Sequence, residues 1–484
     1  MNRKTMNKLK ELTLLAIGFA TAAGCNSTGK EEARKDPNII FVMVDDMGYA
    51  DIGSYGQDAY ETPHLDSMAL KGMRFTHAYS GCTVCAPARS TLMTGLHTGH
   101  TQVRGNTGGI PLPDEAVTIA EVLQKDGYTC GGFGKWGLGD LNTEGVPENQ
   151  GFDIFYGYYH QIHAHYYYPE YLINTGKKVP LPANKNFYEQ HDSIGGMPVK
   201  TNGQKYKHSN YLIFDKMKDW IRNHQDDKFF CYAPWTPPHA RYEIPKNDPA
   251  WQAVKDKPWS TRAKGHAAFN IIIDRQMGEL FDLLDELELQ KETIVFFCSD
   301  NGASNRFENS LNSSGKLRGQ KRTMYEGGLR VPFIAKWPGK IQAGTTSELP
   351  VYFPDIFPTL AELANVNTGM KKLDGISFLP ALLGEKKQEK HNYMYWELPI
   401  YEWSKRKYSG KLQQAVRHDQ WKMVRHNDEK PWELYNLSRD PAESNNIADQ
   451  HPEIIKEMNQ WVERNRLNMI PQKEPEMPEG KRYR

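Results

Sequence analysis

The sequence predicts an α/β protein whose central sheet is mostly parallel and is covered by helices on both faces. Four continuous apolar, strand-like runs alternate with stretches that have the periodicity of helices. The strand-like runs are residues 38–44, 128–133, 228–232 and 293–298, and the helical stretches are residues 118–125, 211–223 and 267–288. Strands without a polar face that alternate with helices are typical of a parallel sheet buried between helical layers.

Polar or charged residues follow each of the four predicted strands. They are Asp45 and Asp46 after the first strand, Lys135 after the second, His239 after the third, and Asp300 and Asn301 after the fourth. Parallel strands end at a common edge, and open α/β sheets bind their ligands at that edge. We therefore expect these side chains to converge on one site.

Two further segments of the core have a predicted place. Residues 152–169 hold three histidines among six tyrosines, which favours a loop at the rim of the site. Residues 354–365 form an apolar helical pattern and are expected to cover the sheet.

A smaller α+β subdomain with an antiparallel sheet is expected after the core, because the chain changes to short β-rich pieces and one last helix. The pieces are residues 393–396, 413–417, 421–424 and 432–435, and the helix is residues 452–466. We therefore divide the chain into a core at residues 37–385, a subdomain at residues 386–470 and a flexible tail at residues 471–484.

The balance of charge gives no support to a nucleic-acid partner. The 484 residues contain 60 Lys and Arg against 59 Asp and Glu. A chain without a net positive field is not drawn to polyanions as a whole, so no nucleic-acid partner is expected.

The N-terminus resembles a bacterial lipoprotein signal. Three lysines precede a short apolar run at residues 12–23, which ends in Ala22-Ala23-Gly24-Cys25. The resemblance implies a signal peptide at residues 1–24, lipidation of Cys25, and a polar tether at residues 25–36. The protein would then be exported and anchored to a bacterial membrane, in the periplasm or at the cell surface. An ordinary signal peptide with a chance cysteine is the alternative.

The segment Cys82 to Gly95, CTVCAPARSTLMTG, predicts a helix that begins near Cys85. Pro87 suits the first turn and Gly95 suits the end of the helix. Backbone N–H groups of a first turn attract an anion, and Arg89 adds a guanidinium group one turn further on. This arrangement predicts a sulfate or phosphate site next to Cys85.

Residues 85–89, Cys-Ala-Pro-Ala-Arg, with the tail Ser-Thr-Leu-Met-Thr-Gly, resemble the signature of the formylglycine-dependent sulfatases. The resemblance implies that Cys85 is oxidised to formylglycine, whose hydrate supplies the nucleophile. Other interpretations of Cys85 are a buried structural cysteine, half of a Cys82-x-x-Cys85 redox pair, and a thiolate nucleophile. The cysteines at 130, 231 and 298 lie in or beside apolar runs, which favours buried free thiols.

Asp45, Asp46, Asp300 and Asn301 offer hard oxygen ligands, which suit calcium or magnesium better than zinc. Helix capping is the ordinary alternative for either pair alone. The family resemblance implies a divalent cation here, usually Ca²⁺ and less often Mg²⁺, that bridges to the sulfate and to residue 85. The implied metal ligands are therefore Asp45, Asp46, Cys85, Asp300 and Asn301.

Other family residues are matched one by one. Arg89 resembles the arginine that steadies the aldehyde hydrate, and Lys135 in Gly-Lys-Trp resembles a lysine that contacts the sulfate. His239 and Lys321 match a family histidine and lysine, either of which would protonate the departing sugar oxygen. Seen alone, His239 would be an ordinary loop histidine and Lys321 a surface lysine.

One departure from the family pattern concerns a histidine. Many members carry it two residues after the lysine that Lys135 matches, where this chain has Gly137. We hypothesise that His163 or His165, from the tyrosine-rich segment, takes over part of that contact with the substrate.

The resemblance spans about residues 38–448 and implies an alkaline-phosphatase-like core that hydrolyses sulfate esters. The aromatic segment and the lipoprotein leader favour a sulfated glycan of the galactose or N-acetylgalactosamine type as substrate. The same reading requires a formylglycine-generating or anaerobic sulfatase-maturing enzyme as a partner. The alternatives are a phosphomonoesterase or phosphodiesterase of the same superfamily, and a non-catalytic glycan-binding surface lipoprotein.

Overall fold

The computed structural model describes residues 36–107, 110–191, 193–198, 200–201, 204–304, 310–370, 372–402 and 404–467. The predicted signal peptide, the lipid-bearing Cys25, nearly all of the tether and the tail at 471–484 lie outside these residues, so they stay predictions. The described residues from 37 to 467 belong to one compact unit. Among the described helices, none has the length and apolar character needed to cross a membrane.

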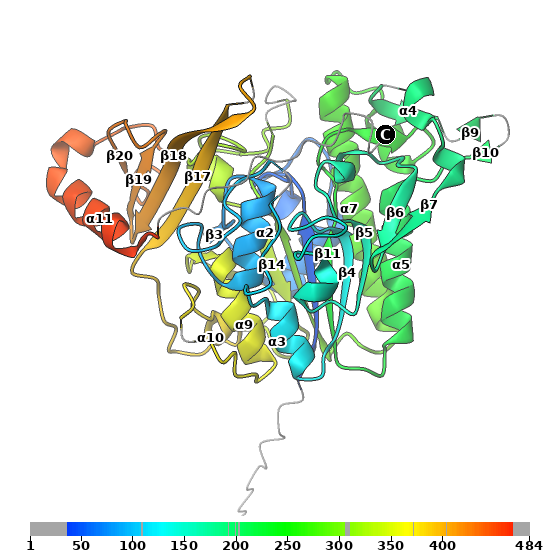
Figure 1. The fold of residues 1–484 in the computed structure, drawn as a ribbon, viewed down its shortest axis with the longest axis horizontal. Coiled ribbons are helices and arrows are strands. Elements are labelled where there is room, and N and C mark those ends of the chain that lie inside the picture. The colour runs from blue at the N-terminus through cyan, green and yellow to red at the C-terminus, as the bar shows by residue number, and fades with distance from the viewer. Residues whose placement is uncertain are drawn as a thin grey trace, which may run out of the picture. The chain divides into compact units, whose positions relative to one another are not determined.

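The predicted α/β class is confirmed by a ten-stranded mixed sheet in the order β15-β2-β14-β13-β1-β11-β4-β5-β6-β7 (Figure 1). Its strands are β1 (Asn38–Val44), β2 (Met73–Phe75), β4 (Thr129–Lys135), β5 (Ile154–Tyr158), β6 (Tyr171–Asn174), β7 (Lys177–Pro180), β11 (Phe229–Pro234), β13 (Thr293–Ser299), β14 (Phe333–Lys336) and β15 (Thr345–Ser347). The middle five, β13-β1-β11-β4-β5, pair in parallel. Their carboxyl ends therefore share one edge of the sheet.

Alternation along β1 shows why helices cover both faces. Ile39, Phe41 and Met43 belong to one apolar cluster, whereas the residues between them belong to a second cluster on the other side. The first cluster includes residues of α2 (Cys85–Thr94), α3 (Ile119–Lys125), α9 (Ile356–Leu363) and α10 (Leu379–Leu382). The second includes residues of α1 (Pro63–Lys71), α5 (Ser209–Asn223) and α7 (Thr261–Glu286). A strand buried on both faces needs no polar side, which explains its continuous apolar sequence.

Smaller elements complete the core. They are β3 (Ala78–Tyr79) paired with β16 (Val351–Tyr352), β8 (Gly195–Met197) paired with β12 (Glu243–Pro245), β9 (Lys200–Thr201) paired with β10 (Gln204–Lys205), and the short helices α4 (Phe187–Gln190), α6 (Pro249–Val254) and α8 (Glu326–Leu329).

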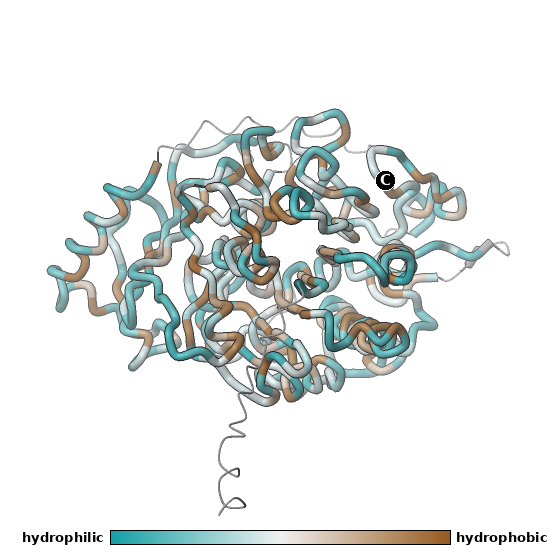
Figure 2. Tube along the Cα trace, turned by 90° about the horizontal axis from the view of Figure 1, so that it is seen from below, coloured by the Kyte–Doolittle hydropathy of each residue, from teal (hydrophilic) through white to brown (hydrophobic). Residues whose placement is uncertain are grey.

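The predicted C-terminal antiparallel sheet is also confirmed. It contains β17 (Met394–Glu402), β18 (Lys407–His418), β19 (Trp421–Arg425) and β20 (Glu433–Asn436), followed by α11 (Pro452–Asn465). In Figure 2 the tube of α11 is mostly hydrophilic with apolar residues at intervals, as expected for a helix with one buried face. That face contributes Met458 and Val462 to a small core beneath the sheet.

The prediction of a rim loop at residues 152–169 is wrong in part. Residues Ile154–Tyr158 form β5 of the main sheet, and only the segment after it lies at the rim, where His163–His165 make a single 3-10 turn. The glycine and tyrosines of this stretch hid a strand, because its apolar content is aromatic rather than aliphatic.

Several histidines are buried in an uncharged state, and they predict loss of stability in acid. Burial lowers the pKa of His163 to about 3 and that of His208 to about 4. Below the unfolded-state pKa of about 6.5 the unfolded chain binds protons that the folded chain refuses. The free energy of unfolding should therefore fall as pH drops from about 6.5 towards 4, by about 1.4 kcal/mol per pH unit for each such histidine.

Urea unfolding between pH 7 and 5 measures this slope. His163→Phe, which keeps a ring between the aromatic neighbours of His163, should reduce the slope by the share of one histidine. The control Leu70→Gln changes an exposed side chain that does not titrate and should leave the slope as it is. An unaltered slope in His163→Phe would contradict the assignment of His163 as a histidine that is buried without charge.

Candidate active site

The residues predicted at the strand ends converge. Asp45 and Asp46 follow β1, Asp300 and Asn301 lie at the end of β13 beside it, and Lys135 is the last residue of β4. His239 comes from the loop after β11. All of these side chains are buried, so the site lies in a recess at the edge of the sheet rather than on an open surface.

Helix α2 brings Cys85 and Arg89 to the same recess. Cys85 is its first residue, and the helix ends at Gly95, whose φ of 68° closes the helix with a bond from its N–H to the carbonyl of Thr91. A left-handed residue at this position is best filled by glycine. Both ends of the helix therefore fall where the sequence predicted them.

The Asp45 carboxylate is the centre of the site. It accepts a hydrogen bond from Lys135 Nζ at 2.5 Å and one from Cys85 Sγ at 3.2 Å, and Arg89 Nη2 lies 3.6 Å away. Burial raises the pKa of Asp45, but the charges of Lys135, His239 and Arg89 outweigh burial and hold that pKa well below its usual range. Asp45 is therefore ionised.

Asp46 brings a second carboxylate to the recess. Its backbone is left-handed, with φ of 71°, and one of its carboxylate oxygens lies within 4.8 Å of one of Asp45. The carboxylate accepts hydrogen bonds from Lys321 Nζ and from Asn301 Nδ2, the latter at 2.7 Å, and His239 Nε2 lies 3.6 Å from it. Lys321 Nζ is also 3.4 Å from Cys85 Sγ.

The side chains of Asp300 and Arg89 form the floor of the recess. Arg89 Nη2 donates to Asp300 at 2.8 Å and Nη1 donates to the carbonyl of Lys135 at 2.5 Å. Burial and the charge of Asp45 raise the pKa of Asp300 to about 6. Burial, together with the charges of Asp300 and Asp45, raises the pKa of the Cys85 thiol to about 12, so an unmodified thiol here is protonated at neutral pH.

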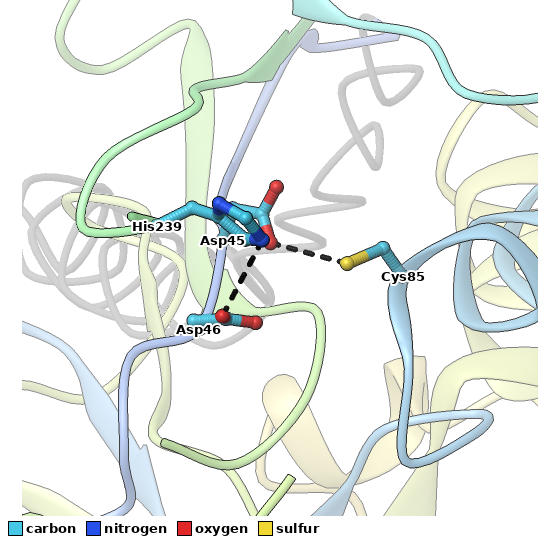
Figure 3. A group of neighbouring side chains, drawn as sticks. All are labelled: Asp45, Asp46, Cys85 and His239. Carbon is cyan, nitrogen blue, oxygen red and sulfur yellow. Dashed lines mark hydrogen bonds and ion pairs between the residues drawn. The ribbon is translucent and has the colours of Figure 1, made fainter. Parts of the chain in front are cut away.

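The donor atoms fit a divalent cation. Asp45, Asp46, Cys85 and His239 each offer one ligand atom, and these four atoms lie within 4.8 Å of one another (Figure 3). Asn301 Oδ1 is buried and accepts no hydrogen bond from any described residue, which leaves an oxygen available to a metal. Carboxylate and amide oxygens suit calcium or magnesium. The structure adds His239, which the sequence did not place among the ligands.

A cavity of about 320 Å³ opens above this cluster. Asp46, Cys85, Lys135, His239 and Lys321 line it, and so does His165, whose ring stacks on that of His239 with centroids 4.3 Å apart. Burial and the charges of His239 and Lys135 hold the pKa of His165 well below its usual range, so the ring is neutral. Of the two histidines proposed to replace the family contact, His165 reaches the cavity.

His163 does not line the cavity. It is buried between the rings of Tyr158 and Tyr171, with centroid distances of 4.9 and 4.5 Å. The two histidines are two positions apart on a 3-10 turn, so their side chains point in different directions. The part of the hypothesis that concerns His163 has no geometric support.

Several lining residues were missed from the sequence. They are Asn106, Thr107, Gln161, Ile162, Ser304, Gln320, Arg322 and Thr323. All lie in loops, and all but Arg322 are common uncharged residues. Only the position of Arg322, directly after Lys321, gave a signal that could have identified one of them.

The comparisons with known proteins decide the family. A model of the sulfatase family matches residues 37–366, and a model of the C-terminal part of N-sulphoglucosamine sulphohydrolase matches residues 319–468. Arylsulfatase A of Bos taurus is 32% identical over 501 residues, covering 94% of this chain and 90% of the relative. The chain belongs to the sulfatase family.

Two further comparisons support this sulfatase assignment. N-acetylgalactosamine-6-O-sulfatase of Bacteroides thetaiotaomicron is 29% identical over 523 residues, covering 95% of this chain and 99% of the relative. The crystal structure of Ps i-CgsB in complex with k-i-k-neocarrahexaose has the same fold, with a TM-score of 0.74 and 24% identity over 89% of this chain and 92% of that chain. The predictions of an alkaline-phosphatase-like fold and of a sulfuric ester hydrolase are confirmed.

The sulfatase family implies a metal ion and a formylglycine, and the cluster around Cys85 fits both. The thiol stands where the modified side chain would act, next to two carboxylates and two lysines. The redox-pair alternative has no support, because Cys82 and Cys85 are both free thiols and Cys82 Sγ donates to the carbonyl of Glu397 at 3.7 Å. The other described cysteines, 130, 231 and 298, are buried free thiols as predicted.

Metal binding is testable without any measurement of activity. Adding Ca²⁺ to EDTA-treated protein should raise the thermal unfolding midpoint, because a ligand at 100 times its Kd stabilises the folded state by about 2.7 kcal/mol. Asp45→Asn keeps the shape of the side chain but removes its charge, so it should abolish most of that increase.

The control Asp58→Asn alters an exposed carboxylate away from the cavity and should keep the full increase. An equal increase in Asp45→Asn and in the unaltered protein would contradict a cation at Asp45. Repeating the titration with Mg²⁺ distinguishes the two metals.

Proposed function

We propose that this sulfatase removes sulfate from a galactose- or N-acetylgalactosamine-type residue of a sulfated glycan, with residue 85 as formylglycine and calcium at Asp45 and Asp46. The observation that carries the proposal is the meeting of Cys85, three buried carboxylates and three basic side chains at the base of one polar cavity. A cavity floor with this mixture of charges suits an anionic ester together with a metal ion.

The position of residue 85 determines from where the nucleophile attacks the sulfur of the ester. When formylglycine is present, its hydrated aldehyde supplies a hydroxyl nucleophile and a second hydroxyl that allows the sulfate to be expelled later. Lys321 Nζ, at 3.4 Å from Cys85 Sγ, lies close enough to orient a group at that position. Asp45 is in contact with the same atom at 3.2 Å.

Three cations are arranged to act on the sulfuryl oxygens. Arg89 and Lys135 are fixed by Asp300 and Asp45, and Lys321 is fixed by Asp46. Burial lowers the pKa of Lys321, but the charges of Asp46 and Asp45 outweigh burial and raise it, so its ammonium group keeps its proton. Preorganised charges of this kind contribute on the order of 10²–10³ in rate each.

The leaving sugar oxygen needs a proton, and two groups face it across the cavity. Lys321 is held protonated. His239 is neutral, because burial and the charges of Lys321 and Lys135 hold its pKa well below the usual range, and its Nδ1 is in contact with the carbonyl of Ala240. Both side chains line the cavity next to Cys85. We assign the proton transfer to this pair, with the protonated Lys321 as the source of the proton and the neutral His239 able to pass it on.

Two observations support a glycan as the substrate. They are the polar side chains that line the cavity and the name of a bacterial relative. Asn106, Gln161, Ser304 and Thr323 line the opening, and amide and hydroxyl side chains suit the hydroxyls of a sugar. The Bacteroides relative is named an N-acetylgalactosamine-6-O-sulfatase. His165 would then contact the sugar in place of the histidine that Gly137 replaces.

Maturation and location belong to the same proposal. A formylglycine at residue 85 requires a formylglycine-generating or anaerobic sulfatase-maturing enzyme in the host. The leader before Cys25 supports export and a lipid anchor, which would place the enzyme where large glycans are accessible.

Replacing the nucleophile tests the chemistry. Cys85→Ala should abolish sulfate release and leave the far-ultraviolet circular dichroism and the unfolding midpoint close to those of the unaltered protein, because the residue is small and begins a helix. Peptide mass spectrometry of active protein should show the aldehyde at residue 85. Only cysteine at residue 85 in active protein, or full activity in Cys85→Ala, would overturn the mechanism.

Leaving-group dependence identifies the proton donor. A sugar alkoxide needs protonation far more than a nitrophenolate does, so loss of the donor should slow a sulfated sugar by about 10²–10⁴-fold and 4-nitrophenyl sulfate much less. Comparing His239→Gln with Lys321→Met on both substrates shows which variant has the selective loss. Equal losses on both substrates in both variants would contradict proton donation by this pair.

A further inference from the structure

A second cavity adjoins the catalytic one. It has a volume of about 260 Å³, and Asn106, Thr107 and Arg322 line both cavities. Because the same three residues border both, the two cavities are immediate neighbours. Small-ligand sites usually measure about 300–1,000 Å³, and only the two cavities together fall well inside that range.

The far wall of the second cavity comes from the C-terminal sheet. Leu398, Pro399, Ile400 and Tyr401 belong to β17, and Tyr408 and Gln413 belong to β18. The sheet therefore forms a wall of the cavity that adjoins the catalytic one. The sequence alone had given this sheet no role.

The pairing of β17 and β18 is interrupted at this wall. Pro399 pairs with Leu412 and Tyr401 pairs with Tyr408, so the single residue Ile400 lies opposite the three residues 409–411. An irregularity of this kind bends a strand and redirects its side chains, and such irregularities are common next to active sites. Here it accompanies the two tyrosines that line the cavity.

The tyrosines give the wall a carbohydrate-binding character. The rings of Tyr401 and Tyr408 make an edge contact with centroids 5.1 Å apart, and both side chains are half-buried. A tyrosine ring offers an apolar face and a polar tip at little entropic cost, which suits a sugar ring with its hydroxyls. Gln413 and Asn106 add amide groups nearby.

The wall is firmly attached to the loop that follows α2. Tyr408 Oη is 3.0 Å from Thr107 Oγ1, and its ring packs so closely on Gly105 that a Cβ there would lie 2.0 Å from the hydroxyl oxygen. On the other side of the loop, Asn106 accepts a hydrogen bond from the N–H of Ala86 at 3.0 Å. The cavity is therefore preformed, and its position relative to the first turn of α2 is fixed.

Arg322 gives the cleft its charge preference. Its N–H donates to the carbonyl of Thr83 at 3.0 Å, and the residue is left-handed, with φ of 74°. This holds the exposed side chain between the two cavities, one position after Lys321. A guanidinium group at that point favours a carboxylate or a sulfate on the substrate.

We propose that the β17–β18 wall and Arg322 form a second sugar subsite, which binds the residue next to the one that loses its sulfate and prefers an acidic residue there. The proposal rests on the proposed function, since the occupant of this subsite belongs to the same glycan chain. The substrate is accordingly an oligosaccharide or polysaccharide, and a monosaccharide sulfate fills only the catalytic cavity.

Three probes test the subsite: a sulfated N-acetylgalactosamine monosaccharide, a tetrasaccharide in which the same sugar alternates with a uronic acid, and that tetrasaccharide after reduction of its carboxyl groups. The unaltered enzyme should have a higher kcat/KM on the tetrasaccharide than on the monosaccharide. In Tyr401→Ala the ratio of these two kcat/KM values should fall about tenfold, because the lost contact is made only by the longer substrate.

Arg322→Asn is chosen because asparagine tolerates a left-handed backbone. It should lower kcat/KM on the uronic-acid tetrasaccharide by about 10–100-fold relative to the carboxyl-reduced one. The matched control is Lys411→Ala, on the same hairpin, where the exposed lysine pairs with Glu429 and does not line the cavity. Lys411→Ala should behave as the unaltered enzyme on all three probes.

The outcomes separate this inference from the proposed function. If the unaltered enzyme cleaves the monosaccharide and the tetrasaccharide alike, or if Tyr401→Ala leaves their ratio unchanged, the subsite is overturned and the sulfatase chemistry stands. If Arg322→Asn prefers the uronic-acid tetrasaccharide as strongly as the unaltered enzyme does, the charge preference assigned to the subsite is overturned. No sulfate release from any probe by protein that carries formylglycine overturns the proposed substrate, and the subsite falls with it.

Discussion

The site depends on a balance of buried charge. Three carboxylates, from Asp45, Asp46 and Asp300, meet three cations, from Arg89, Lys135 and Lys321. An unpaired charge in such a place would cost several kcal/mol, so each cation is held by a carboxylate and each carboxylate by a cation. The parallel sheet makes the balance possible, because β1 and β13 end side by side and deliver their acids to the same point.

The same balance explains why a metal ion and a sulfate ester belong together. A divalent cation at Asp45 and Asp46 adds positive charge to a water-poor recess, and a sulfate monoester adds one negative charge. A divalent cation alone would leave two unbalanced positive charges among the six side chains, whereas the cation and the ester together would leave one. The cluster is thus built to hold a cation and an anion in contact, with Lys135 and Lys321 close to both.

The parts of this molecule that the sequence predicted are those governed by local rules. Buried parallel strands have continuous apolar sequences, and a helix that begins at Cys85 and ends at Gly95 follows from residue preferences. The side-chain directions at His163 and His165 could not be predicted, because two residues on one short turn point to different neighbours. The contact of Tyr401 and Tyr408 with the cleft depends on packing between segments about 300 residues apart, which no local pattern records.

That packing also explains how a distant sheet can act on the substrate. Lys422 of β19 is buried between Glu326 and Glu443, at 2.8 and 2.9 Å, and Trp396 of β17 donates to the carbonyl of Ser80 at 2.8 Å. Ser80 lies five residues before Cys85, so the sheet is fastened to the segment that carries the nucleophile. If the sheet moved away from the core, this buried ion pair would break and leave unpaired charges, which is strongly destabilising. The sheet is therefore a fixed wall and not a hinged lid. Recognition of a neighbouring sugar and placement of residue 85 consequently share one rigid framework.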